Sequence, residues 1–190
     1  MLPTSLIIIR SALLPDREAI AQVITAAFSR EGAIIVDLVN DLIKDPTAQP
    51  VVSLVATLQE NSGEEVVGYI LFSNAWLEGG DRSESIAILA PLCVHPNYQK
   101  QGIGGQLIED AVQRLTAAGV EIAFLLGYPS YYPRHQFSPA GKQGFEPTYP
   151  VPPKDASAWM LRELKPGAAE SRSGKVICAD ALNAPQHWQE

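Results

Sequence analysis

An amphipathic helix over residues 103–118, with an apolar segment close on either side, constrains the fold more than any other feature. Its apolar residues recur at intervals of three and four, and Gly119 ends it. Residues 85–94 before it and residues 120–126 after it are both typical of strands. A strand, a helix and a strand joined so tightly form a right-handed unit with two parallel strands. The chain is therefore predicted to contain a sheet with at least one helix packed on it.

The rest of the chain adds antiparallel strands and two more helices to this unit. Strands are predicted at residues 6–10, 51–58, 66–76 and 158–164, and helices begin near Pro15 and after Gly32. The expected class is α/β (α+β), with a central mixed, mostly antiparallel sheet flanked by helices. The 190 residues fit one domain. We place it at residues 1–164, followed by a C-terminal extension over residues 165–190, which has one candidate strand at residues 175–178.

Charge and cysteine content restrict the partners. Lys plus Arg number 14 and Asp plus Glu number 21, so the formal net charge of −7 disfavours nucleic acid. No window reaches the roughly 18 apolar residues of a membrane span, and the N-terminus lacks the pattern of a signal peptide. Cys93 and Cys178 fit no zinc or redox motif. We expect a cytoplasmic protein without metal or membrane contact, either a monomer or a homodimer.

The segment between the strand end near Val94 and the helix carries the chemistry. It ends in Gln99, Lys100, Gln101, Gly102, Ile103, Gly104 and Gly105. The first N–H groups of a helix have no internal partner, and the helix dipole makes that end positive. Glycines allow a phosphate to approach the backbone, and Lys100 adds a charge. The segment predicts a small-anion site, while the alternative is that the glycines only shape a turn.

Other known motifs do not fit this spacing. A Walker A loop needs Gly-x-x-x-x-Gly-Lys-Ser/Thr, which is absent, and a dinucleotide fingerprint needs a third glycine where this chain has Leu107. The Gly-x-Ser-x-Gly elbow of a serine hydrolase is also absent.

The pattern Gln/Arg-x-x-Gly-x-Gly/Ala between a strand and a helix resembles the pyrophosphate loop of the GNAT superfamily of acyl-CoA-dependent N-acetyltransferases. Gln99, Gly102 and Gly104 match it, and the resemblance covers about residues 5–164. The flanking string Pro-Leu-x-Val-His-Pro-x-Tyr-Gln-x-Gln-Gly-Ile-Gly is similar to that of bacterial acetyltransferases. An aromatic segment, residues 131–137, follows the next strand, as it does in the family.

The resemblance implies a sheet that is splayed where acyl-CoA, here acetyl-CoA, binds. The pantetheine arm would run along Leu92, Cys93 and Val94, with the N–H near Val94 facing the thioester carbonyl. The loop from Gln99 to Gly105 would hold the pyrophosphate, largely through its backbone. Pro91 either loosens strand pairing for the ligand or marks only a bulge.

The resemblance also assigns Tyr132 as the general acid that protonates the departing thiolate, since a phenol has a pKa of about 10. Tyr131 is its rival for that role, and both can instead be packing aromatics. Where relatives often have a glycine before the aromatic residue, this chain has Gln136, which leaves the shape of the short helix open.

The general base is where this chain departs from some relatives, which carry a glutamate in the strand before the loop. Residues 86–89 read Ile-Ala-Ile-Leu and offer no carboxylate. Glu78, Asp81 and Glu84 are candidates from the preceding turn, although surface charges of this kind are usually only solvated. His95 titrates in the right range, and the alternative is that it supports the loop. His135 and His187 have no partner at metal-ligand spacing.

The leading hypothesis is transfer of an acetyl group from acetyl-CoA to a primary amine of a small molecule or protein. The missing carboxylate motivates an alternative, a non-catalytic acyl-CoA-binding or sensor module. A third hypothesis is transfer of a longer acyl group.

Overall fold

The computed structural model describes residues 6–60 and 63–188. Its strands are β1 (Leu6–Ser11), β2 (Val52–Glu60), β3 (Gly63–Leu77), β4 (Ile86–Val94), β5 (Ile122–Leu126), β6 (Ser138–Pro139), β7 (Phe145–Glu146), β8 (Trp159–Glu163) and β9 (Gly174–Cys178). Its α-helices are α1 (Arg17–Phe28), α2 (Gly32–Lys44) and α3 (Ile103–Ala117). Short 3-10 turns connect these elements, including η5 (Tyr132–His135).

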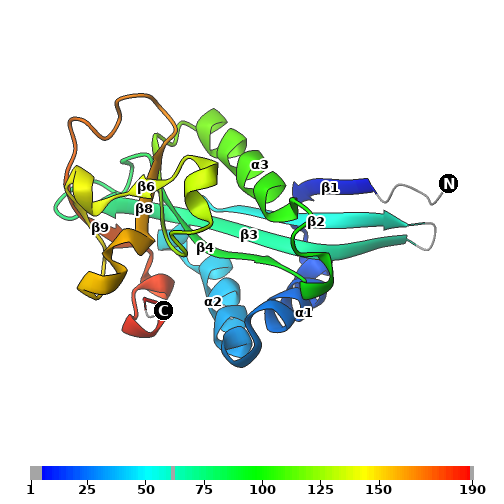
Figure 1. The fold of residues 1–190 in the computed structure, drawn as a ribbon. Helices are drawn as coiled ribbons and strands as arrows, with labels where there is room; N and C mark the ends of the chain where they lie inside the picture. Colours follow the sequence, from blue (N-terminus) through cyan, green and yellow to red (C-terminus); the bar gives the residue numbers. More distant parts are fainter. Residues whose placement is uncertain (1–5, 61–62, 189–190) are drawn as a thin grey trace.

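The strands join in one sheet in the order β1-β2-β3-β4-β5-β8-β6 (Figure 1). Within the described residues, only β4–β5 and β7–β9 pair in parallel, and the other pairs are antiparallel. The parallel pair β4–β5 is the one that α3 connects, as the tight strand–helix–strand sequence predicts. The expected mixed, mostly antiparallel sheet flanked by helices is confirmed.

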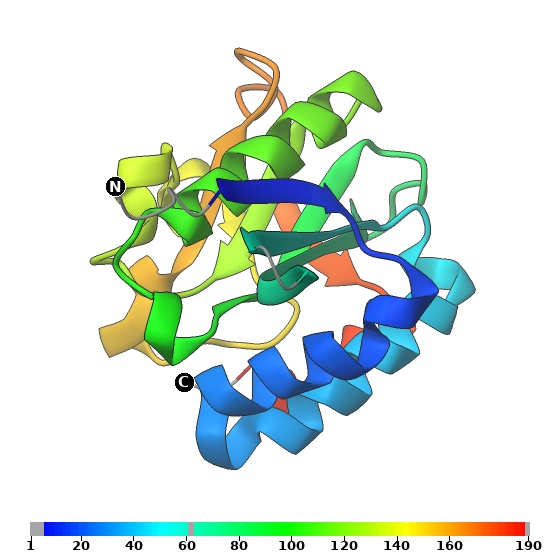
Figure 2. The ribbon, with the colours of Figure 1, turned by 90° about the vertical axis from the view of Figure 1, so that its right-hand side faces the viewer.

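Helices cover both faces of the sheet, with α3 on one face and α1 and α2 on the other (Figures 1 and 2). Alternate strand residues point to opposite faces, so the sheet divides the buried side chains into two clusters. Tyr69, Ile88 and Phe124 pack on the α1/α2 face. Ile70 and Leu89 pack on the other face, in one cluster with Leu107 of α3.

Residues Leu14–Lys44 are long and apolar enough by composition to resemble a membrane span. The structure divides them into α1 and α2, of 12 and 13 residues. Each is shorter than the roughly 20 residues that a span needs. Gly32 begins α2 against α1, where a Cβ atom would lie 2.7 Å from the Thr25 Cα. The two helices pack closely side by side, and each buries one face (Figure 2).

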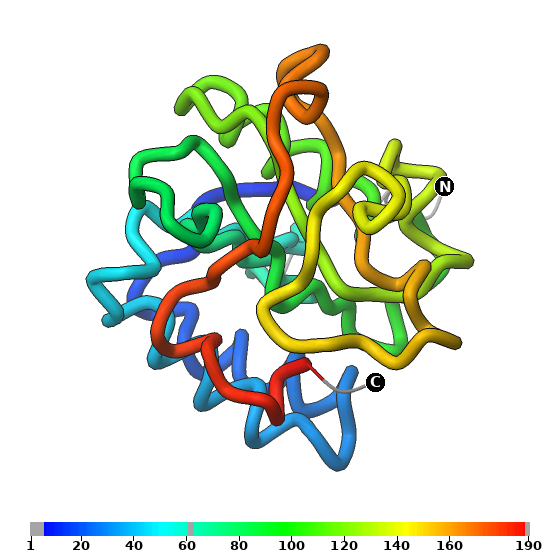
Figure 3. The backbone as a smooth tube through the Cα atoms, turned by 90° about the vertical axis from the view of Figure 1, so that its left-hand side faces the viewer, coloured from blue at the N-terminus to red at the C-terminus, as the bar shows by residue number. Residues whose placement is uncertain are grey.

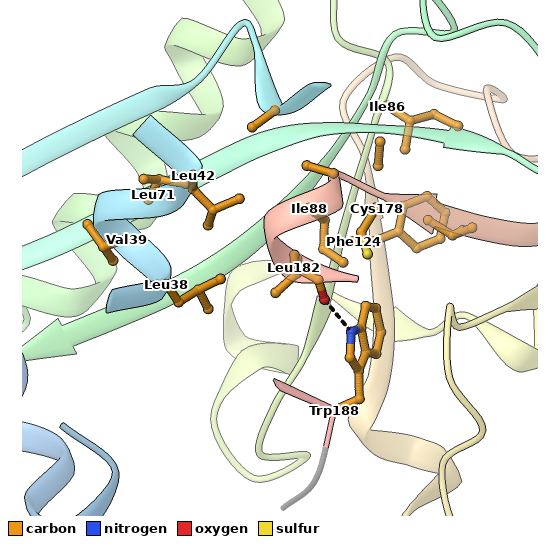
Figure 4. Packing of buried hydrophobic residues seen from close by; sticks show 14 of the residues in the cluster. Leu38, Val39, Leu42, Leu71, Ile86, Ile88, Phe124, Cys178, Leu182 and Trp188 are labelled. Atoms are coloured by element: carbon orange, nitrogen blue, oxygen red, sulfur yellow. Dashed lines mark hydrogen bonds between the residues drawn. The ribbon is translucent and has the colours of Figure 1, made fainter. Parts of the chain in front are cut away.

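The end of the chain is part of this core. β9 pairs with Ala75–Leu77 of β3, and the chain then runs along the α1/α2 side of the sheet (Figure 3). Cys178, Leu182 and Trp188 are buried there together with residues of α2 and β4 (Figure 4). The Trp188 indole N–H donates to the Leu182 carbonyl at 3.0 Å. The C-terminal segment therefore closes one end of the core that the rest of the chain builds.

Candidate active site

The sheet opens along the second half of β4. β5 pairs with Ile86–Ile88 alone, and no described strand pairs with that edge over residues 89–94. On the other edge, β3 pairs with β4 up to Val94, with a register shift that leaves Ala90 and Pro91 unpaired. A bulge at a proline therefore lies just where the sheet opens.

Backbone donors line this open edge. The His95 N–H donates to the Val67 carbonyl at 2.8 Å, so the backbone of His95 faces β3. In an antiparallel ladder, successive residues face alternate sides. The N–H groups of Leu92 and Val94 therefore point away from β3 into the open edge, and that of Cys93 points back to β3. A ligand lying along β4 could pair with Leu92 and Val94 as a strand would.

The loop after β4 is braced by its own glutamines. The Gln99 side-chain amide donates to the Val94 carbonyl at 3.0 Å, and that of Gln101 donates to the Asn97 carbonyl at 3.5 Å. Lys100 is exposed, with a φ of 61°. These bonds hold the loop shape and leave the Lys100 ammonium in solvent.

The loop runs into α3 through Gly102, which has a φ of 81°, a conformation that glycine adopts without strain. The first bond of the helix is donated by the Gln106 N–H to the Gly102 carbonyl at 3.1 Å. The N–H groups of Ile103, Gly104 and Gly105 precede it and lie at the positive end of the helix dipole. A Cβ at Gly102 would meet nothing within 4 Å, so this side of the turn is open to an anion.

Gly104 and Gly105 serve a second purpose that the sequence did not predict. A Cβ at Gly104 would lie 2.6 Å from the Tyr131 hydroxyl, and one at Gly105 would lie 2.9 Å from the His135 Cε1. The two glycines thus let the aromatic segment pack directly on the first turn of α3. Burial raises the pKa of Tyr131, so its phenol stays protonated at neutral pH.

Tyr132 begins η5, six residues after the end of β5. A Cβ at Gly127 would come within 2.4 Å of the Tyr132 ring, which also contacts Tyr131 edge-on at 5.1 Å between centroids. Gly127 follows β5 directly, three residues after Phe124, the last residue that pairs with β4. Gly127 is thus a site residue that the sequence analysis missed, and its signal is a glycine directly after a strand.

The candidate bases do not gather at the open edge. The Glu84 carboxylate accepts from the Leu77 N–H at 2.7 Å, and Asp81 accepts from the Ser83 N–H at 3.0 Å. Both stabilise the turn before β4. Glu78 is the first residue of that turn and is exposed. That turn lies at the opposite end of β4 from Val94, about 26 Å away at 3.3 Å per residue.

His95 is used by the loop, because its Nδ1 accepts from the Asn97 N–H at 3.3 Å. His135 and His187 both have a lowered pKa because burial disfavours their charged form. Within the described ranges, no group of three or more His, Cys, Asp or Glu side chains could hold a metal ion.

The Cys93 thiol is buried, and desolvation raises its pKa to about 12. The thiol therefore stays protonated at neutral pH and is a poor nucleophile. The backbone at this position pairs with Tyr69 of β3, so the donors that β4 offers to a ligand are those of Leu92 and Val94 on either side.

A splayed sheet, a glycine-rich turn at a helix start and an aromatic segment beside the gap define an acyltransferase of the GNAT type. The Acetyltransferase (GNAT) family model matches residues 36–137, and the chain belongs to this family of N-acetyltransferases, which the sequence resemblance predicted.

Curated relatives agree with this assignment. The chain is 39% identical over 168 residues to the uncharacterized N-acetyltransferase YjhQ of Escherichia coli (strain K12). The matched region covers 87% of this chain and 88% of that protein. It is 30% identical over 146 residues to the uncharacterized N-acetyltransferase YhbS of the same strain, spanning 77% and 81% of the two chains.

Solved structures share the fold. The crystal structure of Escherichia coli YhbS in complex with CoA superposes with a TM-score of 0.83 at 27% identity, over 97% of this chain and 96% of that one. A GNAT family acetyltransferase from Brucella melitensis in complex with acetyl-CoA gives a TM-score of 0.71 at 27% identity, over 93% and 98%.

Proposed function

We propose that the chain binds acetyl-CoA along the open half of β4 and transfers its acetyl group directly to a primary amine of a small molecule or protein. One observation carries this proposal: β4 loses its partner strand at Leu89, and its unpaired edge leads straight into an anion-binding helix start. The CoA and acetyl-CoA complexes of the two solved relatives support it.

In this proposal the coenzyme takes the place of a strand. Its pantetheine amides pair with the backbone of Leu92 and Val94, on either side of Cys93. The pyrophosphate lies against the N–H groups that follow Gly102, within the segment from Gln99 to Gly105. Lys100 contributes charge at this end through solvent, since its side chain is exposed.

The reaction joins the amine nitrogen to the thioester carbon and breaks the carbon–sulfur bond. Charge develops on the carbonyl oxygen, where a fixed N–H donor such as that of Val94 has most effect. Tyr132 gives its phenolic proton to the departing thiolate, and the proton that the amine loses passes to water and restores the phenol. The products are an amide and coenzyme A.

The acceptor enters as a neutral amine in this scheme, because the candidate carboxylates are held in the turn at the far end of β4. Two features favour direct transfer over an acyl-enzyme. The Cys93 thiol is protonated and buried, and its N–H faces β3. Direct transfer is a single chemical step, for which one proton donor, Tyr132, suffices.

The location and assembly in this proposal are those of a cytoplasmic monomer or homodimer. Two buried free thiols, Cys93 and Cys178, support a reducing compartment. The net charge of −7 supports an acceptor whose amine is protonated, and so positively charged, in bulk solvent before it binds.

Thermal unfolding with acetyl-CoA, coenzyme A and ATP tests the binding step. A ligand at 100 times its dissociation constant adds about 2.7 kcal/mol, which raises the melting temperature of a domain this size by about 5–10 °C. We expect the rise with both coenzymes and none with ATP. No rise with either coenzyme would refute the proposal.

Release of coenzyme A from acetyl-CoA in the presence of a panel of primary amines tests turnover. Binding without release over the whole panel would instead favour the sensor module. Faster release from propionyl-CoA or butyryl-CoA than from acetyl-CoA would favour transfer of a longer acyl group.

A further inference from the structure

The guanidinium of Arg162 joins three elements around the candidate site. Arg162 lies on β8, and its Nη1 and Nη2 donate to the two carboxylate oxygens of Glu109 on α3 at 2.8 and 3.2 Å. The same Nη1 donates to the backbone carbonyl of His135, at the end of η5, at 3.1 Å. One side chain thus fixes the aromatic segment to α3, the helix that follows the anion-binding turn.

This contact is built from a buried side chain. The Arg162 side chain is 10% exposed, whereas that of Glu109 is 46% exposed. A planar guanidinium can serve both carboxylate oxygens and a carbonyl together, which an ammonium cannot. Because Glu109 reaches solvent, removal of Arg162 leaves no buried carboxylate without a partner, so the fold can survive the change.

The carbonyl that Arg162 holds comes directly before a strained residue. Gln136 ends η5 with a φ of 64°, in the left-handed region that costs a glutamine more than a glycine. Three backbone bonds also close the turn. The Gln136 N–H donates to the carbonyls of Pro133, at 3.1 Å, and Tyr132, and the Phe137 N–H donates to the Tyr132 carbonyl at 3.4 Å.

The strained end of η5 also determines where the neighbouring aromatic side chains lie. Phe137 is 2% exposed, and its ring lies 5.9 Å from that of Tyr132. On the other side of η5, Tyr131 and His135 pack on Gly104 and Gly105 of α3. A shift of the His135 carbonyl would therefore move Tyr132 relative to β4.

We propose that Arg162 is a positioning residue that holds the left-handed end of η5 on α3 and thereby keeps Tyr132 in register with the open edge of β4. The catalytic part of this inference rests on the proposed function. Its conformational part concerns this chain's own contacts and is tested without turnover.

The first measurement is hydrogen exchange at the amides of Gln136 and Phe137, which report the closed turn. In Arg162→Met we expect exchange at both amides to rise about tenfold or more, with amides in the middle of α3 unchanged. The added substitution Gln136→Gly should restore protection, because glycine adopts φ near 64° without strain. Arg114→Met, which removes an exposed ion pair to Asp110 on the same helix, is the matched control.

The second measurement separates kcat from coenzyme affinity, with acetyl-CoA and the best acceptor of the amine panel. Misplacement of a reacting group by about 1 Å can cost about 10²-fold in rate. We expect Arg162→Met to lower kcat about tenfold or more, with Gln136→Gly recovering most of it. Coenzyme affinity should change less than about threefold, because the phosphate-binding N–H groups belong to α3 itself.

Three results would overturn the inference. They are unchanged exchange at Gln136 and Phe137 in Arg162→Met, failure of Gln136→Gly to restore protection, and an equal effect of Arg114→Met. Absence of coenzyme binding in the unsubstituted protein would refute the proposed function alone, since the exchange measurements need no coenzyme.

Discussion

The two halves of β4 differ in their partners more than in their residues. Ile86–Ile88 is paired on both edges and has apolar layers above and below it. Leu89–Val94 is equally apolar, yet one of its edges has no described partner strand, and its donors at Leu92 and Val94 are left facing the gap. The closed half contributes stability through burial, while the open half offers backbone groups to a ligand.

The difference teaches that exposed backbone, rather than side-chain polarity, can mark the site on a strand. Both halves of β4 consist of apolar residues, so the residue types alone do not show which half is paired. The pairing of β4 with β5 stops at Ile88, and the bulge in its pairing with β3 follows at Ala90 and Pro91. Substitutions that act on backbone donors or on Tyr132 should therefore affect the open half alone.

The largest effect is expected for Tyr132→Phe. Loss of a positioned general acid costs about 10²–10⁴-fold in rate, so kcat should fall by that range while coenzyme affinity stays within about twofold. The ring still fits over Gly127, because only the hydroxyl is removed. Rates of coenzyme A release and calorimetric binding of coenzyme A measure the two quantities.

Tyr131→Phe is the control, since the Tyr131 hydroxyl lies against Gly104 at the anion-binding end. Full activity in Tyr132→Phe with a large loss in Tyr131→Phe would transfer the acid role to Tyr131.

A second, smaller effect is expected for removal of one backbone donor. In Val94→Pro the N–H that faces the gap disappears, and loss of one oxyanion donor costs about 10²–10³-fold in rate. Stability should change little, because proline is tolerated where a strand edge is unpaired. Chemical denaturation and turnover measure both.

Cys93→Pro is the matched comparison one residue away. Its N–H faces β3, so this change should cost about 1–3 kcal/mol of unfolding free energy for the partner left unpaired. Equal destabilisation by the two proline substitutions would show that the edge at Val94 is closed in solution.

A third effect concerns the first turn of α3. In Gly104→Ala the new methyl would meet the Tyr131 hydroxyl at 2.6 Å, so the aromatic segment must shift and coenzyme affinity should fall about tenfold. Tyr131→Phe in the same chain removes the oxygen and leaves the next ring atom at 3.7 Å, an ordinary contact. The double variant should therefore bind coenzyme A almost as the unsubstituted protein does.

Gly141→Ala is the control, because a Cβ there meets nothing within 4 Å. If the double variant binds no better than Gly104→Ala, the methyl blocks the phosphate itself, which is the role that the sequence motif assigns to Gly104.

Local sequence signals predicted the elements of the fold and the loop well. The periodicity of residues 103–118 and the stop at Gly119 locate α3, which spans Ile103–Ala117. Apolar runs next to turn residues also located β3 and β4 to within three residues. These features depend on neighbours in the sequence, so a single chain suffices to read them.

Long-range contacts could not be predicted in the same way. The packing of Tyr131 on Gly104, the contact of the buried Arg162 guanidinium with Glu109, and the placement of Tyr132 over Gly127 join residues that are 5 to 53 positions apart. No periodicity encodes them. The left-handed conformation of Gln136 was visible only as an unexpected residue where relatives often have glycine.

The smallest effect is expected at Cys93, which lies in the open half but turns its N–H toward β3. Cys93→Ala should leave kcat within about twofold, because the thiol is protonated and takes no part in direct transfer. An acyl-cysteine intermediate would instead require a large loss and a labelled Cys93 after incubation with radioactive acetyl-CoA.

The raised pKa of Cys93 also gives the sign of a stability change. The folded thiol titrates at about 12 and the unfolded one at about 9. Stability from the protonated thiol is therefore complete below pH 9 and declines as pH rises toward 12, because the unfolded chain loses the proton first. Thermal unfolding between pH 8 and about 10.5 should show a shallower decline in Cys93→Ala than in the unsubstituted protein. If stability declined equally with pH in the two proteins, solvent would already reach this thiol, and the α1/α2 face of β4 would be open to water at Cys93.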